Sequence, residues 1–430
     1  MTYAAFNDPS LSFDTQQIHA GYNPEEHFRA KAVPIYHTAA FELGDYDRCV
    51  RLFGYEEEGD SYVRFSNPTN RVLEQRMAIL EGGSAALAMA SGMAGISSTL
   101  LNITQSGDEI AAVRTLYGGT QSLFSEILPT YGVTTRWVDD PDDLDSYRQA
   151  ITDKTRVLYI EALGNPCINV IDIEAVAALA HEHGIPLVID GTFATPYLMR
   201  PFEFGADIVC HSATKYLAGH GSTISGVVVE RGGFDWQNGK FPQMAEFIET
   251  YSDAVDREEF LVAAFTHRLR NRFLTEFGAQ LSPTSAFLVL QGLETLSLRM
   301  RRHSENALRV ARFLEAHENV LEVSYPALQS SPYYDLSKKY FPRGAGGILS
   351  VRVRGGLKGA QKVLERVRIF SFITNVGDTK SLIVHPATSI QYGLSPQEQQ
   401  GAGVYPDTLR LSIGIENAAD LITDLDRALS

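Results

Sequence analysis

Short apolar blocks alternate with amphipathic stretches along the middle of this chain. Blocks of four to six mostly apolar residues predict buried strands, and apolar residues spaced three or four apart predict helices that each bury one face. The expected strands are 109–113, 134–138, 156–160, 185–190, 206–211 and 224–229, after an apolar run at 85–90. The expected helices are 71–80, 119–128 and 173–183. This alternation predicts a mainly parallel sheet covered by helices on both faces.

The two ends of the chain follow other patterns. Residues 1–70 are irregular and rich in aromatic residues, acids, Gly and Pro. They are interpreted as an arm or a loop-rich segment. The polar, aromatic stretch 232–256 is interpreted as a surface insertion. Further on, the pattern predicts helices at 265–277, 287–317 and 358–367, and strands at 348–353 and 409–413.

Length and composition limit the class of protein. A chain of 430 residues exceeds the usual size of a single core. We therefore expect an N-terminal arm (1–70), a large α/β domain (71–280) and a smaller C-terminal α+β domain (281–430). The net charge of −15 argues against a nucleic-acid groove and against binding to an anionic membrane.

Targeting signals, disulfides and metal clusters are not expected. The N-terminus lacks a basic region followed by an apolar core, and no apolar run approaches the roughly 18 residues of a membrane span. The chain is therefore predicted to be cytoplasmic. Three cysteines, an odd number, imply no disulfide framework, and no group of residues has metal-ligand spacing.

Lys215 stands in the most informative segment. The sequence Ser212-Ala-Thr214-Lys215 follows an expected strand, and the neighbouring expected strand ends on Asp190. Ligands of open α/β sheets bind outside the carboxyl ends of the strands, where all these side chains should lie. A lysine amine can form a Schiff base, hydroxyls can hold a phosphate, and an acid can pair with a pyridinium nitrogen. The segment therefore predicts a site for pyridoxal 5'-phosphate.

Other segments support this site less specifically. The small residues around Gly92, in Ser91-Gly-Met-Ala-Gly95, open an expected helix whose N-terminus could hold an anion, although such spacing more often serves packing. Tyr117 follows a strand and could stack on a flat cofactor or belong to the core. Tyr62 and Arg64 lie on one side of an extended segment, either for phosphate recognition or as surface loop residues.

Arg410 lies within an otherwise apolar expected strand. A buried guanidinium needs a carboxylate partner, because an unpaired charge is costly to bury. The partner could be the carboxylate of an amino-acid substrate or a structural Asp or Glu, and the pattern leaves both open.

Taken together, these segments resemble the cystathionine γ-synthase family of Cys/Met-metabolism enzymes. Ser212-Ala-Thr-Lys-Tyr-Leu-Ala-Gly-His-Gly221 is similar to the family's lysine signature. The resemblance spans nearly the whole chain and implies the aspartate-aminotransferase-like fold (fold type I) with pyridoxal 5'-phosphate. It implies that Lys215 is the Schiff-base lysine and general base, that Asp190 pairs with the ring nitrogen, and that Tyr117 stacks and assists proton transfer.

The resemblance also assigns the remaining site residues. It implies that the phosphate and the rest of the cofactor are held by Gly92, Met93, Asn165, Thr192, Ser212 and Thr214. It implies that the substrate is bound by Arg410, Asn165 and Thr388. It further implies that Tyr62 and Arg64 reach the phosphate of a neighbouring subunit, in active sites shared across dimers that form a homotetramer.

Within the family, the likeness is greatest to the O-acetylhomoserine sulfhydrylase (aminocarboxypropyltransferase) branch. Stretches 233–242, 285–299 and 340–347 resemble that branch. The implied reaction is γ-replacement on O-acetyl-L-homoserine with sulfide or a thiol, which gives homocysteine or methionine plus acetate and places the enzyme in methionine biosynthesis and transsulfuration. Methionine γ-lyases commonly carry a cysteine where this chain has Gly119. This difference argues against a lyase.

Three departures from the family pattern leave alternatives open. Gly191 replaces the usual Asn, Ala162-Leu163 replaces a usual Thr/Ser segment, and Thr388 and Gln391 replace a usual Ser and His. The alternatives are γ-elimination of the methionine or cystathionine lyase type, γ-replacement with a different nucleophile, and a catalytically silent binding protein. The presence of Lys215, Asp190, Tyr117 and Arg410 argues against the last.

Overall fold

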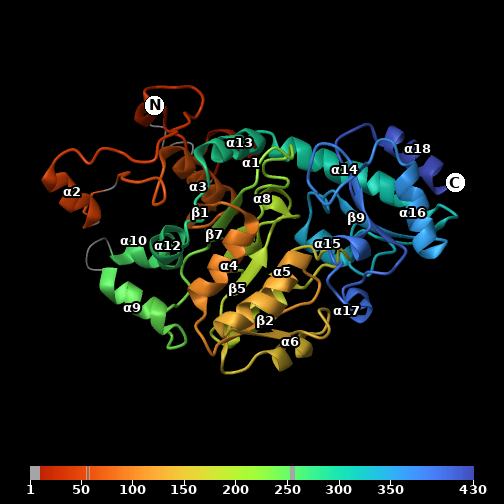
Figure 1. Ribbon diagram of the computed structural model, residues 1–430, viewed down its shortest axis with the longest axis horizontal. Coiled ribbons are helices and arrows are strands. Elements are labelled where there is room, and N and C mark those ends of the chain that lie inside the picture. Colours follow the sequence, from red (N-terminus) through yellow and green to blue (C-terminus); the bar gives the residue numbers. More distant parts are fainter. Residues whose placement is uncertain (1–9, 55, 58, 252–256) are drawn as a thin grey trace.

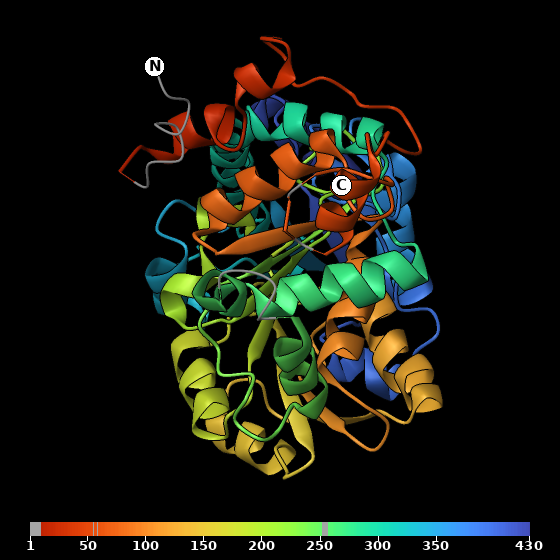
Figure 2. The same ribbon diagram turned by 90° about the vertical axis from the view of Figure 1, so that its left-hand side faces the viewer.

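The computed structural model describes residues 10–54, 56–57, 59–251 and 257–430. Two sheets lie side by side, one formed within residues 85–230 and the other within 320–412 (Figure 1). Turned by 90°, the molecule shows the N-terminal segment, in red, running across its outside (Figure 2). None of the helices in the described ranges is both long and apolar enough to cross a membrane.

The larger sheet has seven strands in the order β1-β7-β6-β5-β4-β2-β3. The strands are β1 (Ala85–Met89), β2 (Glu109–Ala112), β3 (Thr134–Trp137), β4 (Thr155–Glu161), β5 (Leu187–Asp190), β6 (Ile208–His211) and β7 (Gly226–Glu230). Only β7 runs antiparallel to its neighbours. The mainly parallel sheet is thus confirmed, and its central strands are buried because helices cover them.

The predicted helices at 71–80 and 173–183 form near their expected bounds as α3 (Pro68–Glu81) and α7 (Ile173–Glu182), and the helix expected after Ser91 is α4 (Gly92–Ile103). The helix expected at 119–128 is α5 (Gly118–Ser122) followed by a π-helical turn (Leu123–Ile127). The pattern did not predict α6 (Leu144–Ala150) or α8 (Thr195–Leu198). The helix expected at 265–277 comprises α11 (Ala264–Arg268), a π-helical turn (Leu269–Leu274) and α12 (Thr275–Phe277). In Figure 1, α4 and α5 lie in front of the strands whose ends hold the candidate site.

The smaller sheet has five strands in the order β10-β11-β12-β9-β8. They are β8 (Val320–Ser324), β9 (Ile348–Val353), β10 (Ser371–Phe372), β11 (Leu382–Val384) and β12 (Thr408–Ser412). The helices of this part of the chain are α14 (Leu296–Glu315), α15 (Tyr334–Tyr340), α16 (Gly356–Arg366), α17 (Pro396–Gly401) and α18 (Ala418–Leu429). Leu296 and Met300 of α14 belong to the core of the larger sheet, whereas Val310 and Leu314 belong to that of the smaller one. One helix therefore joins the two cores.

The single helix expected at 287–317 is wrong. The structure has two helices, α13 (Pro283–Leu293) and α14, separated at Glu294 and Thr295. The buried guanidinium of Arg299 accounts for the break, because it donates to the carbonyl of Gly292 at 2.6 Å and to the Thr295 hydroxyl at 3.1 Å. The same guanidinium donates to the carbonyl of Tyr216 at 2.7 Å, so the break also fixes the turn that follows Lys215.

The surface insertion expected at 232–256 is also wrong for the described part, up to residue 251. Trp236, Phe241 and Met244 are buried in the main core, and α9 (Pro242–Tyr251) forms there. The rings of Trp236, Phe241 and Phe265 pack with centroids 5.1–5.7 Å apart. In the sequence the aromatic residues of this cluster are separated by polar ones, so the stretch shows no apolar pattern. Residues 252–256 lie outside the described residues.

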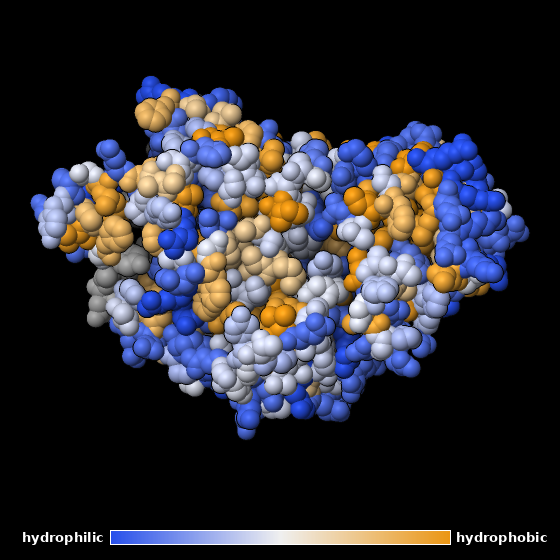
Figure 3. Space-filling view, viewed as in Figure 1, coloured by the Kyte–Doolittle hydropathy of each residue, from blue (hydrophilic) through white to orange (hydrophobic). Residues whose placement is uncertain are grey.

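The N-terminal segment is more ordered than its irregular pattern suggested. It contains α1 (Phe13–His19), whose residue Gln17 bonds Ser297 of α14, and α2 (Tyr46–Phe53). No residue of α2 is buried, and the Tyr46 side chain is 81% exposed. Figure 1 shows α2 projecting away from the sheets, and Figure 3 shows apolar side chains, in orange, on this projection.

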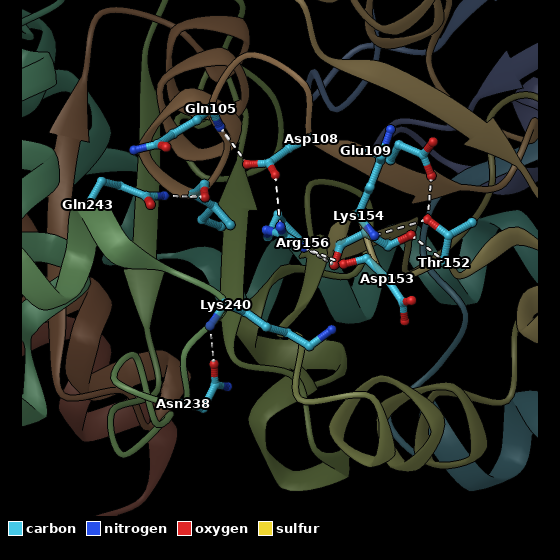
Figure 4. A network of polar contacts seen from close by, with 12 residues as sticks. Gln105, Asp108, Glu109, Thr152, Asp153, Lys154, Arg156, Asn238, Lys240 and Gln243 are labelled. Carbon is cyan, nitrogen blue, oxygen red and sulfur yellow. Dashed lines mark hydrogen bonds and ion pairs between the residues drawn. The ribbon is translucent and has the colours of Figure 1, made fainter.

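A polar network holds the amino ends of β2 and β4 (Figure 4). Arg156 pairs with Asp108 at 3.0 Å, and the Thr152 hydroxyl donates to Glu109 at 2.6 Å. These contacts tie the turns that precede the two strands to each other. They lie at the edge of the sheet opposite the carboxyl ends, so they support the scaffold and take no part in the candidate site.

Candidate active site

A cavity of about 180 Å³ lies at the carboxyl ends of β4, β5 and β6, beside the N-terminus of α4. The predicted site residues that line it are Gly92, Met93, Tyr117, Asn165, Asp190, Thr192, Ser212, Thr214, Lys215 and Arg410. Arg410 comes from β12 of the smaller sheet, whereas the others lie at the end of β5, in α4 or in loops that follow strands of the larger sheet. The cavity therefore lies where the two sheets meet, a common position for a ligand site.

The Lys215 side chain is held from the smaller-sheet side. Its amine lies 2.6 Å from the side-chain oxygen of Asn375. Burial, together with the nearby positive charge of Arg410, lowers the pKa of Lys215 to about 8. At neutral pH about a tenth of the amine is therefore unprotonated, as a nucleophile or base must be, far more than for an ordinary lysine.

This lowered pKa predicts how the apoenzyme captures its cofactor. Only the neutral amine can attack the aldehyde of pyridoxal 5'-phosphate, so the capture rate should rise roughly tenfold per pH unit below about pH 8 and level off above it. An ordinary lysine would give a rate that climbs until about pH 10. Stopped-flow absorbance of apoenzyme mixed with the cofactor measures this profile. A rate that continues to climb from pH 8 to pH 10 would contradict the assignment.

Asp190 ends β5 at the floor of the cavity. Its carboxylate accepts the backbone N–H of Thr192 at 2.9 Å, and the Thr192 hydroxyl in turn accepts the N–H of Ser212 at 2.8 Å. Burial raises the pKa of Asp190, while its bond to Thr192 and the nearby His211 oppose this rise. A buried carboxylate of this kind is stabilised by a cationic partner, which a protonated ring nitrogen would supply.

The N-terminus of α4 is shaped for a small anion. The Ser91 hydroxyl caps the helix by accepting the N–H of Ala94 at 3.0 Å. A Cβ at Gly92 would lie 2.7 Å from the Cβ of Ser212, so only glycine allows this helix end to approach the Ser212 loop so closely. Ser212 and Thr214 add hydroxyls beside the helix end. Helix amides, the dipole and hydroxyls together form a suitable cradle for a phosphate group.

Arg410 is fully buried and is not paired with an acid. Its guanidinium donates to the Asn165 side-chain oxygen at 3.0 Å and to the Asn375 carbonyl at 3.4 Å. Its Nε has no partner, and no carboxylate lies within ion-pair distance of it in the described part of the chain. Burial lowers the pKa of Arg410 to about 10. Of the two partners left open by the sequence, this arrangement favours a substrate carboxylate.

Among the cavity residues that sequence reasoning missed, two bond predicted site residues directly. Asn375 contacts both Lys215 and Arg410, and it lies in an irregular stretch between β10 and β11. Glu161 ends β4, and its carboxylate accepts the backbone N–H of Tyr117 at 2.7 Å. Its place as the last residue of an apolar strand, as for Asp190, is the one signal that could have singled out Glu161.

Three predicted site residues do not line the cavity of their own chain. Arg64 donates to the carbonyl of Thr275 at 2.7 Å, and its guanidinium lies 5.3 Å from the centre of the Tyr62 ring. The Thr388 hydroxyl instead forms a hydrogen bond with Nδ1 of His385 at 2.8 Å. Ile390 of the same loop does line the cavity. Thr388 itself does not line the cavity, and the substrate contact expected for it stays a prediction.

The departure at Gly191 has a steric explanation. A Cβ at this position would lie 2.7 Å from Cε1 of His211, which is itself buried and held by Glu81 at 2.5 Å. Glycine lets the chain pass directly beside this histidine immediately after Asp190. The backbone at Asp190 and Thr192 keeps the hydrogen bonds that orient the acid.

Comparisons with known proteins agree with this geometry. The family profile described as Cys/Met metabolism PLP-dependent enzyme matches residues 14–430. The chain is 44% identical to the O-acetyl-L-homoserine sulfhydrylase of Leptospira meyeri, over 97% of this chain and 96% of that protein. It is 43% identical to the homocysteine synthase of Schizosaccharomyces pombe, over 98% of both chains.

A solved structure extends the likeness to three dimensions. A Campylobacter jejuni protein assigned as an O-acetylhomoserine (thiol)-lyase superposes with a TM-score of 0.91 at 38% identity, over 97% of this chain and all of that chain. That crystal structure contains an N'-pyridoxyl-lysine-5'-monophosphate residue. The family, its fold and its pyridoxal phosphate dependence, all expected from the sequence, are thereby confirmed. This chain belongs to the Cys/Met-metabolism family of pyridoxal phosphate-dependent enzymes.

Proposed function

We propose that this enzyme replaces the γ-substituent of O-acetyl-L-homoserine with sulfide or a thiol, which gives L-homocysteine or methionine and releases acetate. The observation that carries the proposal is the buried, acid-free guanidinium of Arg410, close enough to Lys215 to help lower its pKa. Such a pair suits an amino acid whose carboxylate is bound while its α-carbon faces the lysine. The relatives named as sulfhydrylases and homocysteine synthases support this choice of substrate.

Different residues of the cavity would bind the cofactor and the substrate. Bound pyridoxal 5'-phosphate would supply an electron sink conjugated with the α-carbon of the substrate. Asp190 would keep its ring nitrogen protonated, while the α4 N-terminus, Ser212 and Thr214 would hold its phosphate. Met93 and Thr192 would contact the cofactor, and Tyr117 would stack on its ring. Asn165 would orient Arg410, which binds the substrate carboxylate.

Lys215 would then move protons between neighbouring carbons of the substrate. Its neutral amine takes the α-proton, and a second proton leaves the β-carbon as the C–O bond at the γ-carbon breaks and acetate departs. Sulfide adds to the γ-carbon, and protons return to the β- and α-carbons. Overall, one C–O bond is exchanged for one C–S bond without net oxidation. Tyr117, on the other side of the cavity, would assist as acid or base.

Two of the three predicted site residues outside the cavity, Tyr62 and Arg64, have a place in this proposal. Tyr62 and Arg64 would contact the cofactor phosphate of a neighbouring subunit, so that each active site is completed by a second copy within a homotetramer built from dimers. Residues 1–70 would form the arm that makes this contact, 71–280 the large domain and 281–430 the C-terminal domain. The enzyme would act in the cytoplasm, as part of methionine biosynthesis.

Mixed oligomers test the shared site. An oligomer of Arg64→Ala chains would lack the phosphate contact, and one of Lys215→Ala chains would lack the base. After co-expression, the mixed dimers should regain up to about half of the activity of a native dimer. One of their two sites then has both residues intact, and the other has neither. Activity of co-purified, differently tagged chains measures this. Mixed dimers no more active than the two parents would contradict the assignment in trans.

Product analysis tests the proposed reaction itself. The holoenzyme is incubated with O-acetyl-L-homoserine in the presence and absence of sulfide, and amino acids, acetate and ketoacids are quantified. The proposal expects homocysteine and acetate in equal amounts, with sulfide required. 2-Oxobutyrate and ammonia in the absence of any acceptor would assign the enzyme to γ-elimination. Turnover only with a carbon acid or a larger thiol would identify a different nucleophile.

A further inference from the structure

Hydrogen bonds to the backbone of Tyr117 hold the turn that carries this residue. Tyr117 lies between β2 and α5, lines the cavity, and has 42% of its side chain exposed. A ring with so much free surface has few packing partners that could fix its orientation. Its backbone is better held, because its N–H donates to Glu161 at 2.7 Å and its carbonyl accepts the N–H groups of Thr120 and Gln121 at 2.9 and 3.0 Å.

Glu161 is an unusual acid for a purely structural role. It is 6% exposed, faces the cavity at the end of β4, and stands beside Asp190 in the register of β4 and β5. No lysine, arginine or histidine pairs with it within the described ranges. Burial and the charge of Asp190 raise its pKa well above the usual range. A buried carboxyl group of this kind is costly, and the backbone N–H groups of Tyr117 and Asn165 offset part of that cost.

Two glycines fix the same turn from the side. A Cβ at Gly118 would lie 2.2 Å from the carbonyl oxygen of Ile390, a residue that also lines the cavity. A Cβ at Gly119 would lie 2.6 Å from Cε1 of the Tyr117 ring and 3.2 Å from its Cζ. Any side chain at position 119 would therefore force the ring out of its present orientation.

We propose that Glu161 is a positioning residue that, together with the bare α-carbon of Gly119, sets the orientation of the Tyr117 ring over the cofactor. Glu161 holds the backbone of the turn, and Gly119 leaves room for the ring. Neither group contacts the reacting atoms. Both act on cofactor binding through Tyr117, so the inference rests on the stacking role given to Tyr117 in the proposed function.

Affinity of the apoenzyme for pyridoxal 5'-phosphate is the readout, because it does not depend on which substrate is turned over. Glu161→Ala removes the acceptor and should weaken binding roughly three- to tenfold, the size of one aromatic stacking contact. Glu161→Gln keeps an oxygen acceptor of the same shape and should bind the cofactor nearly as the native protein does. Absorbance titration of the apoenzymes gives the dissociation constants.

A double-mutant cycle shows whether Glu161 acts through the ring. In a Tyr117→Ala background, Glu161→Ala should have no further effect on cofactor affinity, because the ring that it positions is gone. If Glu161→Ala weakened cofactor binding equally in both backgrounds, the proposal would be overturned. It would also be overturned if Glu161→Gln bound the cofactor as weakly as Glu161→Ala, since Glu161 would then act through its charge.

Gly119→Ala provides a second variant that leaves Glu161 intact. It should weaken cofactor binding to a similar extent and change the visible circular dichroism of the bound cofactor, because the ring has turned. An unchanged dissociation constant and spectrum would contradict the proposal even if Glu161→Ala fails to fold. A wrong substrate assignment would alter none of these results and would appear only in the product analysis.

Discussion

Replacing Lys215 with alanine is expected to lower turnover of O-acetyl-L-homoserine by a factor of at least about 10⁴. The variant loses both the amine that links to the cofactor and the base that moves the substrate protons, and general-base catalysis alone typically contributes about 10²–10⁴-fold. Burial in the cavity lowers the pKa of this amine, which lies 2.6 Å from the side-chain oxygen of Asn375. Among the described residues, no other lysine lines that cavity. Steady-state release of acetate and homocysteine gives the measurement.

Its control is Lys362→Ala, which removes an exposed lysine of α16 that donates to the C-terminal carbonyl. This variant should keep native activity. The Lys215→Ala protein should still bind pyridoxal 5'-phosphate through Asp190, Ser212 and Thr214, but without the absorbance band of a lysine adduct. Retention of more than about a tenth of the native rate would show that another group acts as the base.

Replacing Arg410 with methionine is expected to lower kcat/KM for O-acetyl-L-homoserine by a factor of about 10² to 5 × 10³. Loss of a buried, charge-assisted contact to a carboxylate typically costs about 3–5 kcal/mol. The effect should fall mainly on the amino-acid KM and leave the KM for sulfide nearly unchanged. The free protein should be no less stable to heat, because the guanidinium is buried there without an acid partner. Kinetics with each substrate varied in turn, together with a thermal melt, provide both readouts.

Arg352→Met is the matched control. Arg352 lies on the neighbouring strand β9, where it pairs with Asp407 at 2.9 Å on a partly exposed surface. Its loss should leave both KM values unchanged, because partly exposed ion pairs contribute little and Arg352 does not line the active-site cavity. If Arg410→Met lowered stability by several kcal/mol while sparing the amino-acid KM, Arg410 would have to be reinterpreted as a structural residue.

Much of the site could be predicted because its residues follow apolar strands. Asp190 ends such a run and Lys215 lies in the turn that follows one, and parallel strands bring their carboxyl ends to one edge. Arg410 was noticeable for the converse reason, as a charge within an apolar strand. Local pattern was enough in these cases, since strand direction fixed the long-range geometry.

Other features depend on contacts that no local pattern encodes. Asn375 meets Lys215 across 160 positions of sequence, from a segment without periodicity. The break between α13 and α14 depends on where one guanidinium, Arg299, finds carbonyl partners. Tyr62 and Arg64 lie away from the cavity of their own chain, and the contact proposed for them with a second copy depends on assembly, which no local pattern encodes.

The most direct test of the account is to trap the lysine that carries the cofactor, with and without substrate. The holoenzyme is reduced with borohydride and its peptides are mapped by mass spectrometry. The account predicts a pyridoxyl group on Lys215 alone, and a large loss of that label when O-acetyl-L-homoserine is added before reduction, because the substrate displaces the lysine. A label on another lysine, or a Lys215 label unchanged by the substrate, would contradict the site or the substrate proposed for it.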